Sequence, residues 1–140
     1  MTYPADYNDA HRRHWEDAEL LFAKDRWASA DQLYGFSAEC GLKTVMKALG
    51  MWVDPVTGSP KDKFRKHVQD LWSVFANFAQ GRKRGRYLHM LPGGSPFANW
   101  SHHDRYGHRS NFSKQNVAQH RKAAWEIRRV VRRAIQDGLL

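Results

Sequence analysis

Three histidines, two arginines and one aspartate occur within the ten residues from Trp100 to Arg109. An arginine side chain donates hydrogen bonds in a planar fork that matches a phosphate group, and aromatic rings stack on unpaired bases. This combination predicts phosphate and nucleic-acid recognition. The residues that we expect to contact nucleic acid are Arg105, Tyr106, His108 and Arg109, together with Arg128 and Arg132 from a later basic stretch.

RNA cleavage is a second chemistry that the same residue types allow. A histidine with a pKa near its ordinary value of ~6.5 can take the proton of a ribose 2′-hydroxyl, and an arginine can stabilise the charged phosphorane that follows. His102 and Arg105 are candidates for these two roles. Binding and cleavage therefore both stay open for this segment.

The histidines also raise the question of a metal site. The ligands would be His102, His103 and His108 with Asp104, or His11 and His14 on one helix face. Adjacent histidines point in different directions in most backbones, so this is not a typical ligand pattern. We therefore expect no metal and no cofactor.

A structural role is the alternative for the same segment. In that case Asp104 and Arg105 pair with Glu39 and Lys43 or cap helix ends, and the aromatic side chains cover the core.

The charge of the chain is strongly positive and unevenly distributed. Its formal net charge is +9 and its isoelectric point is near 10. The segment from Arg82 onward holds most of the arginines and few acids. This asymmetry favours an anionic partner, with RNA or a nucleotide as the first candidate, and a well-solvated basic surface is the alternative.

Cysteine usage and hydropathy predict the compartment. Cys40 is the single cysteine, so no intramolecular disulfide can form and a reducing compartment is the natural inference. No stretch approaches the ~20 apolar residues that span a bilayer. We expect a cytoplasmic protein with no membrane partner.

Apolar residues recur with helical spacing in four segments, and no segment alternates with the period of a strand. The expected helices cover residues 8–24, 26–49, 60–80 and 113–136. Asn8 or Asp9 caps the first, Ser59 with Pro60 starts the third, and Gly81 ends it. The prediction is an all-α protein, an antiparallel up-and-down bundle of four to five helices forming a single domain over residues 1–140.

A long basic loop at about residues 81–112 interrupts this pattern. Four aromatic residues within it would prefer to pack, and we expect a short extra helix around residues 98–105. The aromatic residues are Tyr87, Phe97, Trp100 and Tyr106.

Glu39 and Lys43 lie in the middle of the second helix, which is apolar on most sides and belongs at the centre of the bundle. At this spacing the two side chains are neighbours, and an exposed pair contributes only ~0.2–0.5 kcal/mol. A desolvated pair costs more, so its presence suggests that it fixes a neighbour, for example an arginine or tyrosine of the long loop. Gly35 and Gly41 in this helix indicate close approach of another element.

Three runs in the first half of the chain resemble HEPN domains. They are His14-Trp-Glu-Asp-Ala-Glu-Leu-Leu21, Ala30-Asp-Gln-Leu-Tyr-Gly-Phe-Ser-Ala-Glu-Cys-Gly-Leu-Lys43 and His67-Val-Gln-Asp-Leu71. The resemblance implies a helical bundle that forms a homodimer. It also implies a role near RNA or nucleotides, in toxin–antitoxin pairs or phage defence, or beside a nucleotidyltransferase.

Catalytic members of this family are metal-independent ribonucleases with an arginine four to six residues before a histidine. Arg84 and His89 match this motif with four intervening residues, although Gly85 follows the arginine instead of a polar residue. The resemblance thus adds Arg84 and His89 to the candidate catalytic residues.

The sequence as a whole favours a nucleic-acid- or nucleotide-associated protein of a toxin–antitoxin or defence type. One alternative is an active ribonuclease. Another is a catalytically silent module whose basic face binds an acidic protein, an antitoxin or a nucleotidyltransferase.

Overall fold

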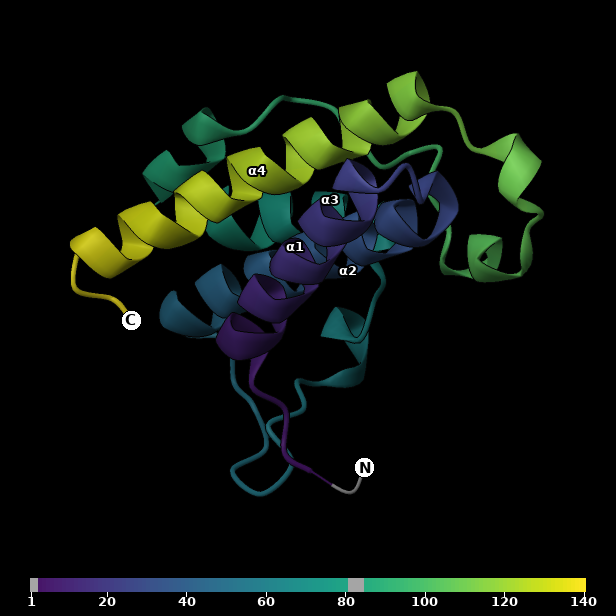
Figure 1. Ribbon diagram of the computed structural model, residues 1–140. Coiled ribbons are helices and arrows are strands. Elements are labelled where there is room, and N and C mark those ends of the chain that lie inside the picture. The colour runs from purple at the N-terminus through teal and green to yellow at the C-terminus, as the bar shows by residue number, and fades with distance from the viewer. Residues whose placement is uncertain (1–2, 81–84) are drawn as a thin grey trace.

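The computed structural model describes residues 3–80 and 85–140 and shows an all-α protein with four packed helices (Figure 1). Four short 3₁₀ helices, η1 to η4, lie between the long ones. Within the described ranges the only strand-like pairing is an isolated bridge between Val53 and Pro60. The elements are α1 (Tyr7–Ala23), α2 (Trp27–Ala48), η1 (Asp62–Phe64), α3 (Val68–Gln80), η2 (Gly85–Met90), η3 (His102–Tyr106), η4 (Arg109–Asn111) and α4 (Lys114–Gln136).

Helix α2 lies at the centre of the molecule, as its sequence predicts. It packs against α1, α3 and α4 and also against η3 and η4. In Figure 1, α1 lies in front of α2 and α4 runs across the pair. Fully buried residues of α2, among them Tyr34, Ala38 and Leu42, fill the core between these elements.

The third helix begins later than the sequence predicts. The expected start at Ser59 and Pro60 is wrong, because Pro60 takes part in the bridge to Val53. The Asp54 carboxylate accepts from the backbone N–H groups of Val56 and Thr57, both at 2.8 Å, which closes a turn in place of a helix. Helix α3 starts only at Val68, and its expected stop, Gly81, lies outside the described residues.

The other helix ends agree with the prediction within two residues. Asp6, and not Asn8 or Asp9, caps α1 by accepting from the backbone N–H of Asp9 at 3.0 Å. Ser113 caps α4 by accepting from the N–H of Asn116 at 3.2 Å.

The long connection between α3 and α4 packs against the helices. Tyr87, Phe97 and Trp100 are buried, whereas Tyr106 is 77% exposed and does not pack as expected. The extra helix predicted near residues 98–105 occurs as η3.

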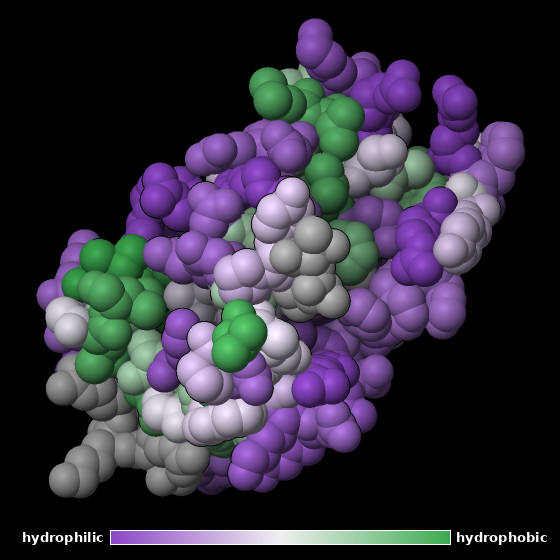
Figure 2. Space-filling model, turned by 90° about the horizontal axis from the view of Figure 1, so that it is seen from below, coloured by the Kyte–Doolittle hydropathy of each residue, from purple (hydrophilic) through white to green (hydrophobic). Residues whose placement is uncertain are grey.

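The surface has no broad apolar area on the face seen in Figure 2, where apolar side chains appear as separate small groups in a mainly hydrophilic face. Large exposed apolar side chains come from different elements, for example Leu20 of α1 and Trp125 of α4. No helix in the described residues is long and apolar enough to cross a membrane.

Gly35 on α2 makes room for Trp100. A Cβ atom at Gly35 would lie 2.0 Å from Cε2 of the indole ring. Gly41 has the same function one and a half turns later, where a Cβ would lie 2.6 Å from Cγ2 of Ile127 in α4. Both glycines therefore permit the close approach that their sequence positions indicate.

We predict that Gly35→Ala lowers the free energy of unfolding by at least about 2 kcal/mol, because the methyl group overlaps the buried indole of Trp100. Urea denaturation measures the change. Gly93→Ala is the matched control, since a Cβ there has no neighbour within 4 Å, and it should change the value by less than about 0.5 kcal/mol. Equal effects of the two substitutions would contradict the packing described.

His11 joins α1 to α2 in the core. Its Nδ1 donates to the carbonyl oxygen of Ser37 at 2.7 Å, and the Ser37 hydroxyl donates to the His11 carbonyl at 2.9 Å. Its Nε2 is buried with no hydrogen-bond partner among the described residues. Burial therefore lowers the pKa of His11 from 6.5 to about 4.

The protein should lose stability as the pH falls from about 6.5 to about 4 because of His11. The unfolded chain binds a proton in this range and the folded chain does not, so stability is complete above the unfolded pKa and decreases below it. The loss is about 3 kcal/mol across the window. Denaturation at several pH values should show a smaller loss in His11→Gln, and identical pH profiles for the two proteins would refute the assignment.

Candidate nucleic-acid interface

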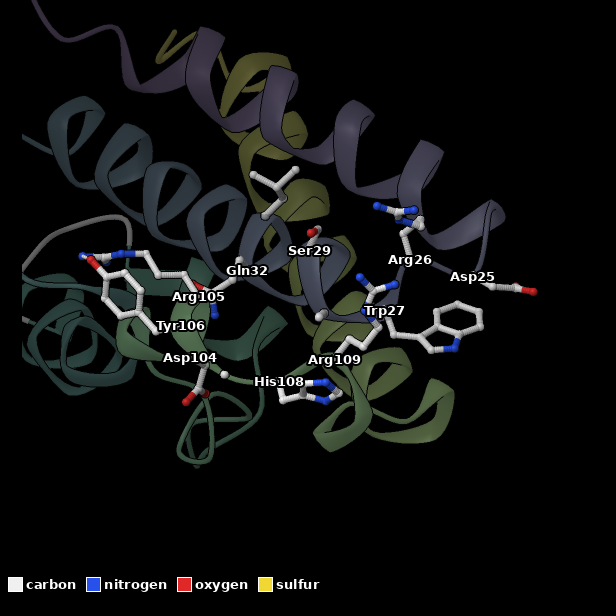
Figure 3. Close-up of a pocket in the computed structure, with 13 residues that line it drawn as sticks. Asp25, Arg26, Trp27, Ser29, Gln32, Asp104, Arg105, Tyr106, His108 and Arg109 are labelled. Atoms are coloured by element: carbon white, nitrogen blue, oxygen red, sulfur yellow. Dashed lines mark hydrogen bonds between the residues drawn. The ribbon is translucent and has the colours of Figure 1, made fainter.

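A surface hollow of about 820 Å³ lies between the beginning of α2 and the segment 104–109 (Figure 3). Four of its lining residues are those that the sequence predicts to contact nucleic acid: Arg105, Tyr106, His108 and Arg109. The structure thus brings these four side chains together at one place. We call this place the arginine hollow.

The beginning of α2 forms the opposite wall, which sequence reasoning did not identify. Arg26, Trp27, Ser29 and Gln32 line it. Arg26 occupies the N-cap position without a side-chain cap, and the first turn holds no acid. The backbone N–H groups of a helix start carry partial positive charge and attract anions. The signal in the sequence was an arginine at a position where serine, threonine, aspartate or asparagine is usual.

The hollow is electropositive. The guanidinium groups of Arg26, Arg105 and Arg109 line it together with two carboxylates. The Asp104 carboxylate already accepts from the backbone N–H of Ser101 at 3.2 Å as part of the η3 capping box. Figure 3 shows Asp25 directed away from Arg105. The arginines therefore dominate the space between the walls.

Local contacts orient the polar groups of the segment 104–109. Arg105 Nη1 donates to the His102 carbonyl and Nη2 donates to the Tyr106 hydroxyl, both at 3.0 Å. The Arg105 Cζ atom lies 4.6 Å from the centre of the Tyr106 ring. A guanidinium has five N–H donors, so others are left for a ligand.

His108 adds a further donor. Its Nδ1 accepts from the backbone N–H of Ser110 at 3.2 Å, so the neutral ring carries its proton on Nε2.

Three residues of α2 fix the segment that leads into η3. The Asp31 carboxylate pairs with His120 Nδ1 of α4 at 2.5 Å, and the Asp31 carbonyl accepts from the Trp100 indole at 2.9 Å. Gln32 Nε2 donates to the Ser101 carbonyl at 3.1 Å, and Gly35 provides the space for Trp100. These contacts attach residues 100 and 101 to the centre of the bundle.

Glu39 and Lys43 form the expected pair, and both side chains are nearly buried. Lys43 Nζ lies 3.4 Å from Glu39 Oε2, and the other carboxylate oxygen lies 2.8 Å from His67 Nδ1. The pair therefore fixes a neighbour, but among the described residues that neighbour is His67 and not an arginine or tyrosine of the long loop. His67 lies just before α3, where its imidazole reaches the carboxylate.

His102 stacks on His67 at the edge of this cluster. Their ring centres are 4.0 Å apart, and Gln69 Nε2 lies 3.3 Å from His102 Nδ1. Partial desolvation, followed by the nearby charges of His67, His103 and Arg105, lowers the pKa of His102.

Neither Asp104 nor Arg105 pairs with Glu39 or Lys43, while Asp104 caps a helix end as the structural alternative expected. Across the described residues, no group of three histidine, cysteine or acidic side chains is arranged to hold a metal ion.

Of the second candidate pair, Arg84 lies outside the described residues, and His89 is not part of this place. His89 is exposed in η2, which packs on α3 and α4 and is anchored to the end of α4 by Arg86 and Asp137, 2.7 Å apart. η3 and η4 precede the beginning of α4 (Figure 1). A helix of 23 residues is roughly 34 Å long, so His89 does not join His102 and Arg105 in one cleft.

Arg128 and Arg132 form a separate basic area. They lie on α4 and do not line the arginine hollow. The Arg128 Cζ atom lies 5.6 Å from the centre of the Trp15 ring of α1. Burial, and then repulsion from Arg132 and Arg12, lowers the pKa of Arg128. The six residues expected to contact nucleic acid thus divide into two groups.

Comparison with protein family models, curated proteins and solved structures found no match to this chain.

We predict that Asp31→Asn lowers the free energy of unfolding by about 2 kcal/mol, because a neutral amide binds the buried imidazole more weakly than the carboxylate does. Chemical denaturation tests this. Asp62→Asn removes an acid from the exposed pair with Arg65 and should cost less than about 1 kcal/mol. If the Asp31 variant is as stable as the Asp62 variant, the buried pair does not hold the structure together.

Proposed function

We propose that this protein binds single-stranded RNA or nucleotides through the arginine hollow. The observation that carries the proposal is the placement of Arg26, Arg105 and Arg109 along one hollow that also includes the uncapped beginning of α2. Guanidinium groups and helix-start N–H groups both favour phosphate. The hollow of about 820 Å³ has the size of a typical small-ligand site.

Aromatic side chains at the two ends of the hollow support RNA over a simple inorganic anion. Figure 3 shows Trp27 at one end and Tyr106 at the other. Tyr106 is largely exposed, and unpaired bases stack on such rings. The phosphates would bind in the middle of the hollow, and the bases would stack on Trp27 and Tyr106 at its two ends.

We also propose that the chain is HEPN-like. The three HEPN-like runs fall on α1, on α2 and at the start of α3, and α2 packs against both of the others in an all-α molecule. In this proposal the protein is a homodimer in a toxin–antitoxin or phage-defence system, with an antitoxin or a nucleotidyltransferase as partner. A silent module that binds an acidic protein is the competing view.

Arg105→Ala combined with Arg109→Ala should weaken binding of a short single-stranded RNA at least about 10-fold, because both phosphate-binding side chains of the segment are lost. Fluorescence anisotropy at several salt concentrations measures this, and the slope of log K against log salt should become shallower by about 1.4. Arg128→Ala combined with Arg132→Ala is the matched control, with the same loss of charge outside the hollow. Greater loss in the control, or tighter binding of an acidic peptide than of RNA, would contradict the proposal.

Metal-independent RNA cleavage is the second candidate function. It is favoured by His102, whose lowered pKa favours the neutral imidazole that accepts a proton, and by Arg105, whose Nη1 donates to the His102 backbone carbonyl at 3.0 Å. We predict that wild-type protein cleaves structured RNA in the presence of a chelator and that His102→Ala reduces the rate at least about 100-fold. Gel electrophoresis of labelled RNA shows the products. The exposed His89 serves as the control, and a rate that depends on His89 and not on His102 would overturn the assignment.

A further inference from the structure

A second, smaller hollow of about 250 Å³ adjoins the arginine hollow. Asp104 and Gly107 line both spaces, so the two hollows are neighbours. Three asparagine side chains and one aromatic ring form its walls: Asn99, Asn111, Asn116 and Phe112. The buried pair of Asp31 and His120 also borders it.

His120 engages the amide of Asn99 in one wall. With Asp31 bound at Nδ1, the other ring nitrogen, Nε2, lies 2.8 Å from the amide of Asn99. One polar group of this amide is thereby occupied, and the other is left for a ligand.

Asp104 supplies the complementary polarity. Its Oδ2 accepts from the Ser101 backbone, which leaves Oδ1 as an acceptor. Asn111 and Asn116 are exposed, and their amide groups can donate or accept. Phe112 is half-buried and places an aromatic ring in the wall beside Gly107. The small hollow therefore combines a flat apolar surface with three amide groups and a carboxylate acceptor.

We infer that the small hollow binds one unpaired base of an RNA whose phosphates occupy the arginine hollow, and that its amide side chains discriminate among the four bases. This inference rests on the proposed function. A base needs a stacking surface and hydrogen-bonding groups of defined polarity along its edge. A space of about 250 Å³ is below the range for a whole drug-sized ligand and suits a single ring system.

The experiment compares binding of four short RNA homopolymers of equal length, of A, C, G and U, by fluorescence anisotropy. The proteins are wild type, Asn111→Ala combined with Asn116→Ala, and Arg105→Ala combined with Arg109→Ala. Neither asparagine side chain makes a hydrogen bond to another described residue, so this variant should fold. An abasic ribose phosphate oligomer serves as the probe for phosphate binding alone.

Wild type should bind one homopolymer roughly 5-fold or more tightly than the weakest, the discrimination expected of well-placed amide contacts. The asparagine variant should bind all four with similar affinity and should bind the abasic oligomer as wild type does. Equal affinities in wild type, or an unchanged preference in the asparagine variant, would overturn the inference while RNA binding persists. If wild type binds no RNA, or if the arginine variant binds as tightly as wild type, the proposed function fails and the inference fails with it.

Discussion

The buried carboxylate of Asp31 is the constraint on which the rest of the structure depends. A charged group inside a protein is costly unless it is paired and hydrogen-bonded. The Asp31 carboxylate is paired with His120 of α4. The backbone carbonyl of Asp31 also accepts a hydrogen bond from the indole N–H of Trp100. The central helix, the last helix and the connecting segment therefore meet at one residue. Displacing the connecting segment would leave polar groups of α2 buried without partners.

This arrangement explains how a long connection forms a defined surface. The buried side chains of Phe97 and Trp100 hold the connection on the core. Its hydrogen bonds with Asp31 and Gln32 fix its position on α2. The next residues form η3 and η4, which pack on α2 near its beginning. The arginines of these two short helices thus line the same hollow as a helix start that has no acidic cap. Together with Arg26, their positive charge outweighs the negative charge of the two carboxylates, Asp25 and Asp104, that also line it.

Much of the fold could be predicted from sequence because helical periodicity and capping residues act locally. The extents of α2 and α4 follow directly from such patterns, and so does the central place of α2. The beginning of α3 was missed because the Asp54 turn and the bridge at Pro60 compete with a local helix-start signal. The four clustered residues of the segment 104–109 were found because they are also close in sequence.

Contacts between distant positions could not be predicted in this way. Arg26 and Trp27 lie nearly 80 residues before Arg105, and no spacing rule connects them. The pairing of Asp31 with His120 spans 89 residues, and that of Glu39 with His67 spans 28. Only the packing shows which acid His67 and His120 each meet.

Native-state amide hydrogen exchange tests the central claim most directly, namely that α2 holds the segment 97–109 in place. The amides of Trp100, Asp104 and Gly107 donate within this segment at 3.0, 3.0 and 2.9 Å. They should exchange far more slowly than in an unstructured peptide, and their protection should fall in Asp31→Asn more than protection at the far end of α4. Exchange of these amides at the rate of a free peptide, while α2 stays protected, would contradict the account.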